Sequence, residues 1–137
     1  MTLSKAESTQ LVRAWLAKWA SHDLDGVLEL IHDDVVFENW TGAVVSGKRS
    51  LRRAWLSWFA AHDNFRFIEE DLFVDEHDQK VLLQWRLEWP SSDESRRGRL
   101  EIRRGVDVLH FRDRKIHRKY TYSKTKVEEV EHGPENS

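Results

Sequence analysis

The sequence predicts an α+β domain, with three N-terminal helices packed on a strongly curved antiparallel sheet in a cone-shaped α+β barrel. Up to residue 61, most apolar residues recur at the spacing of amphipathic helices. From residue 65 onward they alternate with polar residues, which is typical of strands with one buried face. Helices followed by strands indicate a domain whose helices cover one face of a sheet. A strongly bent sheet covered in this way leaves internal space, so we expect a ligand cavity.

Length and composition limit the domain count and the partners. The 137 residues are enough for one domain with a real core. We expect that domain over residues 1–123, followed by a charged, flexible tail over residues 124–137. A net charge of −2 gives no case for nucleic acid or an anionic membrane as a partner. The sequence has no cysteine and no apolar run long enough to span a bilayer, so we expect a cytoplasmic protein.

The first part of the chain predicts three helices. Ser4 and Glu7 have the spacing of a capping box, which opens a helix to about residue 21. A short second helix follows and ends at residues 32–34. The third helix runs from about residue 48 to residue 61 and has a regular apolar stripe. That stripe consists of Leu51, Ala54, Trp55, Trp58 and Phe59.

The strands are predicted from β-rich and alternating segments. They cover residues 35–40, 65–75, 81–89, 99–111 and 115–123, with a short β-like piece at Val44 and Val45. The segment 81–89 has the clearest alternation of apolar and polar residues. The last four strands therefore form an antiparallel meander.

Tryptophan is used heavily for a domain of this size. The seven are Trp15, Trp19, Trp40, Trp55, Trp58, Trp85 and Trp89. Taken one at a time, each is explained as core filler, whereas the group as a whole also fits the walls of an apolar pocket.

Asp107 is the acidic residue with the most unusual surroundings in the sequence. In the strand 99–111 it shares a face with Gly105, Leu109 and Phe111. An isolated carboxylate on an apolar face is costly to bury. Asp107 is therefore expected either to have a charged partner or to take part in chemistry.

The partner of Asp107 depends on the turn of the last hairpin. A three-residue loop places Lys119 beside Asp107, which favours the charged carboxylate. A two-residue loop places Tyr120 there instead and brings His110 opposite His117. Two facing histidines could bind a metal, but no third ligand has suitable spacing, so we expect no metal site.

Basic residues gather near the start of the strand 99–111. They are Arg96, Arg97, Arg99, Arg103 and Arg104. An acidic run over residues 69–78 offers matching charges on another strand. We therefore expect cross-strand ion pairs rather than a nucleic-acid site.

Four local strings, in this order of elements, resemble a known superfamily. They are Ser21-His22-Asp23-Leu24-Asp25-Gly26, Asp34-Val35-Val36-Phe37-Glu38, Ser46-Gly47-Lys48, and Val106 to Ile116 in the last hairpin. Over about residues 11–123 the chain resembles the nuclear transport factor 2-like, or SnoaL-like, superfamily, which has the ketosteroid isomerase-like cone fold. The three-residue hairpin loop fits the family pattern better. The fold hosts enzymes and non-enzymes alike, so the resemblance indicates fold more strongly than activity.

The resemblance implies roles for particular residues. The isomerases have a carboxylate base on the strand after the second helix, and the matching position is Glu38. The isomerases also have an acid that donates a hydrogen bond to an oxyanion, and the matching position is Asp107. Their catalytic Tyr on the first helix matches Trp15, which has no acidic hydroxyl. That departure argues against ketosteroid isomerisation itself but not against acid–base chemistry.

These observations lead to two hypotheses. The first is a SnoaL-like domain that binds a lipophilic small molecule and performs isomerisation, cyclisation or dehydration without a cofactor, with Glu38 as base and Asp107 as acid. The second is a non-catalytic ligand-binding or protein-interaction module, with both carboxylates satisfied by neighbours. A homodimer is expected from the family and from the outer sheet face. The expected pocket residues are Trp15, Trp40, Trp55, Leu109, Phe111, Lys119 and Tyr120.

Overall fold

The three predicted helices are present. The computed structural model describes residues 2–62, 64–91, 94–124 and 128–131. Helix α1 (Lys5–Ala20) begins with the predicted capping box, since the Ser4 hydroxyl accepts from the Glu7 amide and the Glu7 carboxylate accepts from the Ser4 amide. Helix α2 (Leu24–Glu29) is capped by Asp23, and α3 (Lys48–Ala61) has the predicted bounds.

The first strand begins earlier than the sequence pattern indicated. The prediction that the second helix runs to residues 32–34 is wrong, because α2 ends at Glu29 and β1 spans Ile31–Glu38. Ile31 is completely buried and pairs with Ile116 of another strand. This pairing is a contact between segments far apart in the chain, and it overrides the local helical pattern.

The strands of the described residues form one seven-stranded sheet. The remaining strands are β2 (Val44–Ser46), β3 (Arg66–Asp75), β4 (Lys80–Pro90), β5 (Arg99–Arg112), β6 (Lys115–Ser123) and β7 (Glu128–Glu131). Their order is β2-β1-β6-β5-β4-β3, and β7 pairs with β5. All pairs are antiparallel except β1 with β6, which run parallel. The expected meander from β3 to β6 is thus joined to the N-terminal strands at β6.

Part of the predicted flexible tail is a strand. Residues 128–131 form β7, which pairs with residues 99–102 of β5. Residues 125–127 and 132–137 lie outside the described residues.

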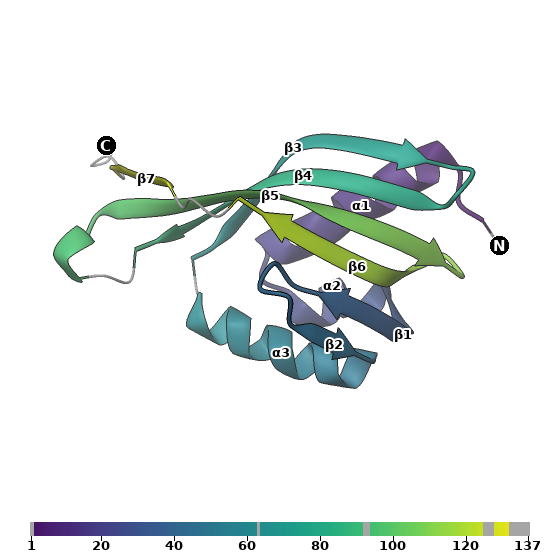
Figure 1. Ribbon diagram of the computed structural model, residues 1–137, viewed down its shortest axis with the longest axis horizontal. Coiled ribbons are helices and arrows are strands. Elements are labelled where there is room, and N and C mark those ends of the chain that lie inside the picture. The colour runs from purple at the N-terminus through teal and green to yellow at the C-terminus, as the bar shows by residue number, and fades with distance from the viewer. Residues whose placement is uncertain (1, 63, 92–93, 125–127, 132–137) are drawn as a thin grey trace.

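The helices lie on one side of the sheet and enclose the core. Figure 1 shows α1 behind β3 to β5 and α3 alongside β1 and β2. Among the described residues, the buried core between these layers contains apolar residues from all three helices and from four strands, β1, β4, β5 and β6. None of the helices in the described ranges has the length and apolar content needed to cross a membrane.

The basic cluster forms the expected cross-strand ion pairs only in part. Arg104 lies 3.5 Å from the Glu70 carboxylate of β3, which is the predicted type of cross-strand pair. Arg103 instead lies over the Trp40 ring, 4.7 Å from its centroid. This second arginine therefore covers an aromatic side chain and does not extend a basic surface.

Candidate functional site

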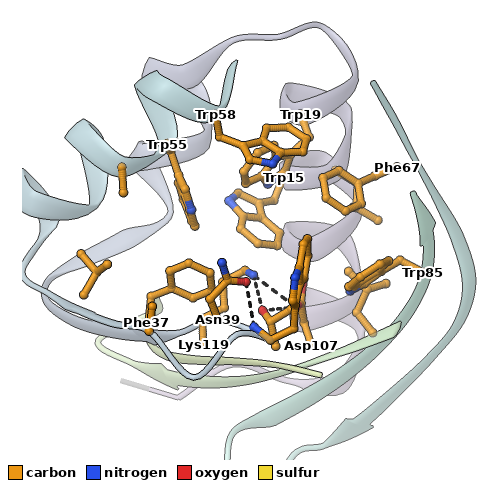
Figure 2. A pocket seen from close by; sticks show the side chains of 17 residues that line it. Trp15, Trp19, Phe37, Asn39, Trp55, Trp58, Phe67, Trp85, Asp107 and Lys119 are labelled. Carbon is orange, nitrogen blue, oxygen red and sulfur yellow. Dashed lines mark hydrogen bonds and ion pairs between the residues drawn. The ribbon is translucent and has the colours of Figure 1, made fainter. Parts of the chain in front are cut away.

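An aromatic cavity of about 220 Å³ lies between the helices and the concave face of the sheet. Six of the seven tryptophans line it, so most of these residues form walls of a pocket. In Figure 2, Trp15, Trp19, Trp55 and Trp58 from α1 and α3 face Phe67 and Trp85 from the sheet. The remaining lining residues include Leu16, Phe37, Asn39, Trp40, Ala43, Val45, Ala54 and Leu83, together with Asp107, Lys119 and Thr121.

Trp19 is the centre of the aromatic wall. Its ring centroid lies 5.0 Å from that of Trp55 and 5.2 Å from that of Phe59. It also makes edge contacts with Trp15, Trp58, Phe65 and Phe67. Edge-to-face and offset contacts of this kind favour a single arrangement of the rings. The contacts around Trp19 therefore hold the rings of the wall in place.

A β-bulge in the last hairpin decides which residues share the floor of the cavity. The loop has two residues, Asp113 and Arg114, both with positive φ, as a type I′ turn requires. One extra residue, His117, then interrupts the ladder between the pairs Phe111↔Ile116 and His110↔Arg118. The loop is thus the two-residue form, while the bulge returns Lys119 to the face on which Asp107 lies.

The polar floor of the cavity consists of Asp107, Lys119 and Thr121. Asp107 pairs with Thr121 across the ladder, and the Thr121 hydroxyl donates to Asp107 Oδ1 at 2.6 Å. Lys119 Nζ donates to the same Oδ1 at 3.1 Å and to Thr121 Oγ1 at 2.7 Å. The three side chains form a closed hydrogen-bonded triangle.

This cluster is shielded from solvent. The Lys119 and Asp107 side chains are 8% and 6% exposed. Burial lowers the pKa of Lys119, and the charge and hydrogen bond of Asp107 oppose that shift. The Lys119 ammonium also lies 4.5 Å from the centroid of the Phe37 ring. Among the residues that line the cavity within the described ranges, Asp107 and Lys119 are the only charged ones.

Glu38 does not line this cavity. Phe37 does, because successive side chains of β1 point to opposite faces, and so does Asn39, which follows the end of the strand. Glu38 is paired with Tyr120 of β6, whose side chain is on the opposite face from Lys119. The structure therefore does not bring Glu38 and Asp107 together in one pocket.

The other predicted pocket residues divide into two groups. Trp15, Trp40, Trp55 and Lys119 line the cavity, whereas Leu109, Phe111 and Tyr120 do not. Leu109 and Phe111 share a sheet face with Asp107, but they are buried in the core nearer the hairpin. Tyr120 lies on the outer face of the sheet, because the bulge reverses the alternation that a regular two-residue hairpin would have.

Trp15, which the resemblance matches to the catalytic tyrosine of the isomerases, already uses its N–H donor within the fold. Trp15 Nε1 donates to the backbone carbonyl of Val27 at 3.0 Å. Trp15 therefore offers the cavity an aromatic face and leaves no N–H for an oxyanion.

Sequence reasoning missed several lining residues. Thr121 depends on the bulge, which has no signal in the sequence pattern. Asn39 could have been found, because it alternates with Glu38 and shares the face of Phe37. Phe67, Leu83 and Trp85 could also have been found from the alternation of their strands, but only the packed sheet shows how close they lie to the polar floor.

The two-histidine interpretation of the hairpin is wrong. His110 pairs with Arg118, and the bulged His117 is not opposite it. The described residues contain no group of three His, Asp or Glu side chains placed to hold a metal ion.

Comparison with known proteins identifies the family. The model of the SnoaL-like domain matches residues 12–119. The chain belongs to the SnoaL-like family. No curated protein matches the chain.

Solved structures share the fold of this SnoaL-like protein at low sequence identity. AclR, a putative hydroxylase from Streptomyces galilaeus, has a TM-score of 0.75 and 18% identity, covering 90% of this chain and 82% of AclR. A SnoaL-like protein of unknown function from Burkholderia thailandensis has a TM-score of 0.73 and 17% identity, covering 90% and 99%. TerC, crystallised with polyporic acid, has a TM-score of 0.71 and 17% identity, covering 85% and 91%. At these identities the likeness shows the fold.

Proposed function

We propose that this protein binds a lipophilic small molecule in the aromatic cavity, with a carbonyl or hydroxyl group of the ligand directed at the polar floor. The observation that carries this proposal is the buried Asp107–Lys119–Thr121 triangle below a wall of six tryptophans. Apolar pockets with a few convergent polar groups are typical ligand sites. The crystallisation of TerC with polyporic acid supports small-molecule binding by this fold.

We further propose that the bound molecule undergoes cofactor-free proton transfer, with Asp107 as the base. Both hydrogen bonds that Asp107 accepts from described residues go to Oδ1, which leaves Oδ2 for a ligand proton. The Lys119 ammonium beside it would stabilise negative charge that develops on the ligand oxygen. Asp107 and Lys119 then supply both the base and the stabilising positive charge, and Glu38 takes no part in the chemistry.

The test uses 2-tetralone, a two-ring ketone with exchangeable α-protons. We expect it to quench the tryptophan fluorescence saturably, and we expect its α-protons to exchange with D2O faster in the presence of protein, as measured by NMR. Asp107→Asn should slow the catalysed exchange about 100-fold or more, because general-base catalysis contributes 10²–10⁴-fold. Glu38→Gln should leave it unchanged.

Two outcomes would contradict the proposal. If 2-tetralone and other two-ring ketones cause no saturable quenching, the cavity is not a site for such ligands. If exchange is lost in Glu38→Gln but kept in Asp107→Asn, the base is Glu38. Thermal unfolding of each variant is the control for folding.

We propose homodimerisation as a second function, with the outer face of the sheet as the interface. Phe73, Leu82, Val108 and Tyr120 are paired successively across four neighbouring strands, so their side chains form one apolar row. Phe73 is 56% exposed. A continuous row on a sheet face is suited to packing against the same row of a second copy about a two-fold axis.

Light scattering at micromolar concentration tests this interface. We expect the wild-type protein to have twice the mass of the chain, and Phe73→Asp to have the mass of one chain, because a charge in the row would lose its hydration on pairing. Leu56→Asp is the matched control, since Leu56 is 54% exposed and belongs to α3, not to the row on the sheet. A wild-type monomer would contradict the proposal.

A further inference from the structure

We propose that Lys119 is a nucleophile as well as an anchor: its amine condenses with the carbonyl carbon of a lipophilic aldehyde or ketone in the cavity to form an iminium ion. This inference rests on the proposed binding function and adds a covalent step to it. Three features support it, namely the position of the nitrogen, the proton acceptor beside it and the size of the space above it.

The nitrogen lies at the boundary between the polar floor and the aromatic wall. Lys119 Nζ is held by two polar partners, Asp107 Oδ1 and Thr121 Oγ1. Its nearest aromatic neighbours are Phe37, with the ring centroid at 4.5 Å, and Trp55, at 5.8 Å. An ammonium has three N–H donors, and the described residues provide polar acceptors for two of them. Lys119 also lines the cavity, so a group bound there lies within reach of this nitrogen.

The surroundings make the neutral amine accessible. Removing an ammonium and a carboxylate from water is costly for both, so the neutral amine–acid pair is closer in free energy to the ion pair here than at the surface. Burial also lowers the pKa of Lys119, which favours the neutral amine, although the charge and hydrogen bond of Asp107 oppose that shift. A lysine desolvated in an apolar pocket is one of the standard forms of an activated amine nucleophile.

Asp107 can carry the protons that the condensation requires. A proton first passes from the Lys119 ammonium to Asp107, and the amine nitrogen then forms a bond with the carbonyl carbon. Asp107 gives its proton to the oxygen and takes one from nitrogen, which leaves a neutral carbinolamine. Asp107 then protonates the hydroxyl, the C–O bond breaks and water leaves. The products are the iminium ion, paired with the Asp107 carboxylate, and one water molecule.

The space above the nitrogen selects the class of carbonyl compound. A cavity of ~150 Å³ lined by apolar side chains accommodates benzene. The present cavity, at about 220 Å³, has room for a substituted ring or a compact two-ring system. Its aromatic walls favour flat apolar carbonyl compounds over small polar sugars or keto acids.

The experiment is reductive trapping in the wild-type protein. The protein is incubated near pH 7 with 2-naphthaldehyde and sodium cyanoborohydride, which delivers hydride to the iminium carbon and leaves a stable secondary amine. Peptide mass mapping then measures the rate at which each lysine gains the naphthylmethyl group. Lys18 is the internal control, because it also pairs with a carboxylate, at 3.8 Å from Asp23, but its side chain is 47% exposed.

We expect Lys119 to be labelled at least ten times faster than Lys18, and 2-naphthylmethanol, which has no carbonyl, to protect Lys119 by occupying the cavity. Labelling of Lys119 no faster than that of Lys18 would overturn the inference. If naphthaldehyde quenches tryptophan fluorescence saturably but Lys119 stays unlabelled, the imine step is wrong and the binding function stands. If neither naphthaldehyde nor 2-tetralone binds, the binding function itself fails. The wild-type measurement needs no variant, so misfolding of a mutant cannot obscure the result.

Discussion

Replacing Asp107 by alanine is expected to lower the free energy of unfolding by about 3–5 kcal/mol. The substitution leaves the Lys119 ammonium buried among aromatic rings, with Thr121 as its remaining polar partner among the described residues. A buried charge without a counter-ion is far more costly than the loss of an exposed ion pair. Chemical denaturation at pH 7, with the slope compared between proteins, measures the change.

The loss in Asp107→Ala should depend on pH in a defined direction. Asp107 is the group that opposes the lowering of the Lys119 pKa, so its removal lowers that pKa further below the ordinary value of 10.5. Between the lowered folded-state pKa and 10.5, the unfolded chain binds more protons than the folded chain, and stability rises with pH. Denaturation at several pH values between 6 and 9.5 should show the variant approaching the wild type as pH rises.

Two controls separate the effect of burial from that of charge. Glu69→Ala breaks the exposed pair with Arg13, whose guanidinium lies 3.0 Å from the carboxylate, and should cost about 1 kcal/mol or less. The double variant Asp107→Ala, Lys119→Met removes both buried charges and should recover much of the loss. A double variant as unstable as Asp107→Ala would show that the cost comes from packing and not from the unpaired ammonium.

Replacing Gly105 by alanine is expected to destabilise the fold by about 1–3 kcal/mol or more and to reshape the cavity. A Cβ at this position would lie 2.2 Å from the backbone oxygen of Tyr122 and 2.8 Å from two ring carbons of Trp85. The backbone atom belongs to a paired strand and cannot move freely, and Trp85 is 1% exposed. Relief of both contacts must therefore shift the backbone where β5 pairs with β6 and also move the Trp85 ring, which is part of the cavity wall.

Denaturation together with 2-tetralone binding tests the role of Gly105. Gly26→Ala is the matched control, because the three atoms nearest to its Cβ would belong to the Asp23 and Lys18 side chains and none to the backbone. Those side chains are 44% and 47% exposed and can shift, at the cost of the cap that Asp23 provides to the Gly26 amide, about 1 kcal/mol. Neither side chain lines the cavity, so we expect unchanged binding. If Gly105→Ala has wild-type stability and affinity, the close packing of Trp85 on Gly105 does not shape the cavity.

Much of the secondary structure could be predicted from local pattern. The capping box of α1, the stripe of α3 and the alternation in β4 are local, because a helix or a half-buried strand repeats its buried side chains at a regular spacing. The exception at Ile31 has a tertiary cause, since the pairing of this residue with Ile116 joins segments more than 80 positions apart.

The two acidic candidate residues also differ in how well the sequence predicted their positions. The sequence alone singled out Asp107 as a carboxylate on an apolar strand face, and Asp107 does lie in the cavity. Glu38 was assigned by resemblance to a family position, but the alternation of β1 directs Phe37, and not Glu38, into the cavity. Resemblance transfers a position along the chain more reliably than it transfers the direction of a side chain.

The sequence by itself determined the helices, most strands of the sheet and the abundance of tryptophan for an aromatic wall, because these depend on composition and on short-range periodicity. The SnoaL-like family follows from the resemblance of local strings and from the family model that matches residues 12–119. Only the tertiary structure decided that Lys119 and Thr121 meet Asp107. One extra residue in β6 shifts the hairpin by one position, and each one-residue shift in a strand exchanges the two faces. A bulge of this kind has no period of its own, so the composition of the cavity floor became defined only when β5 and β6 paired.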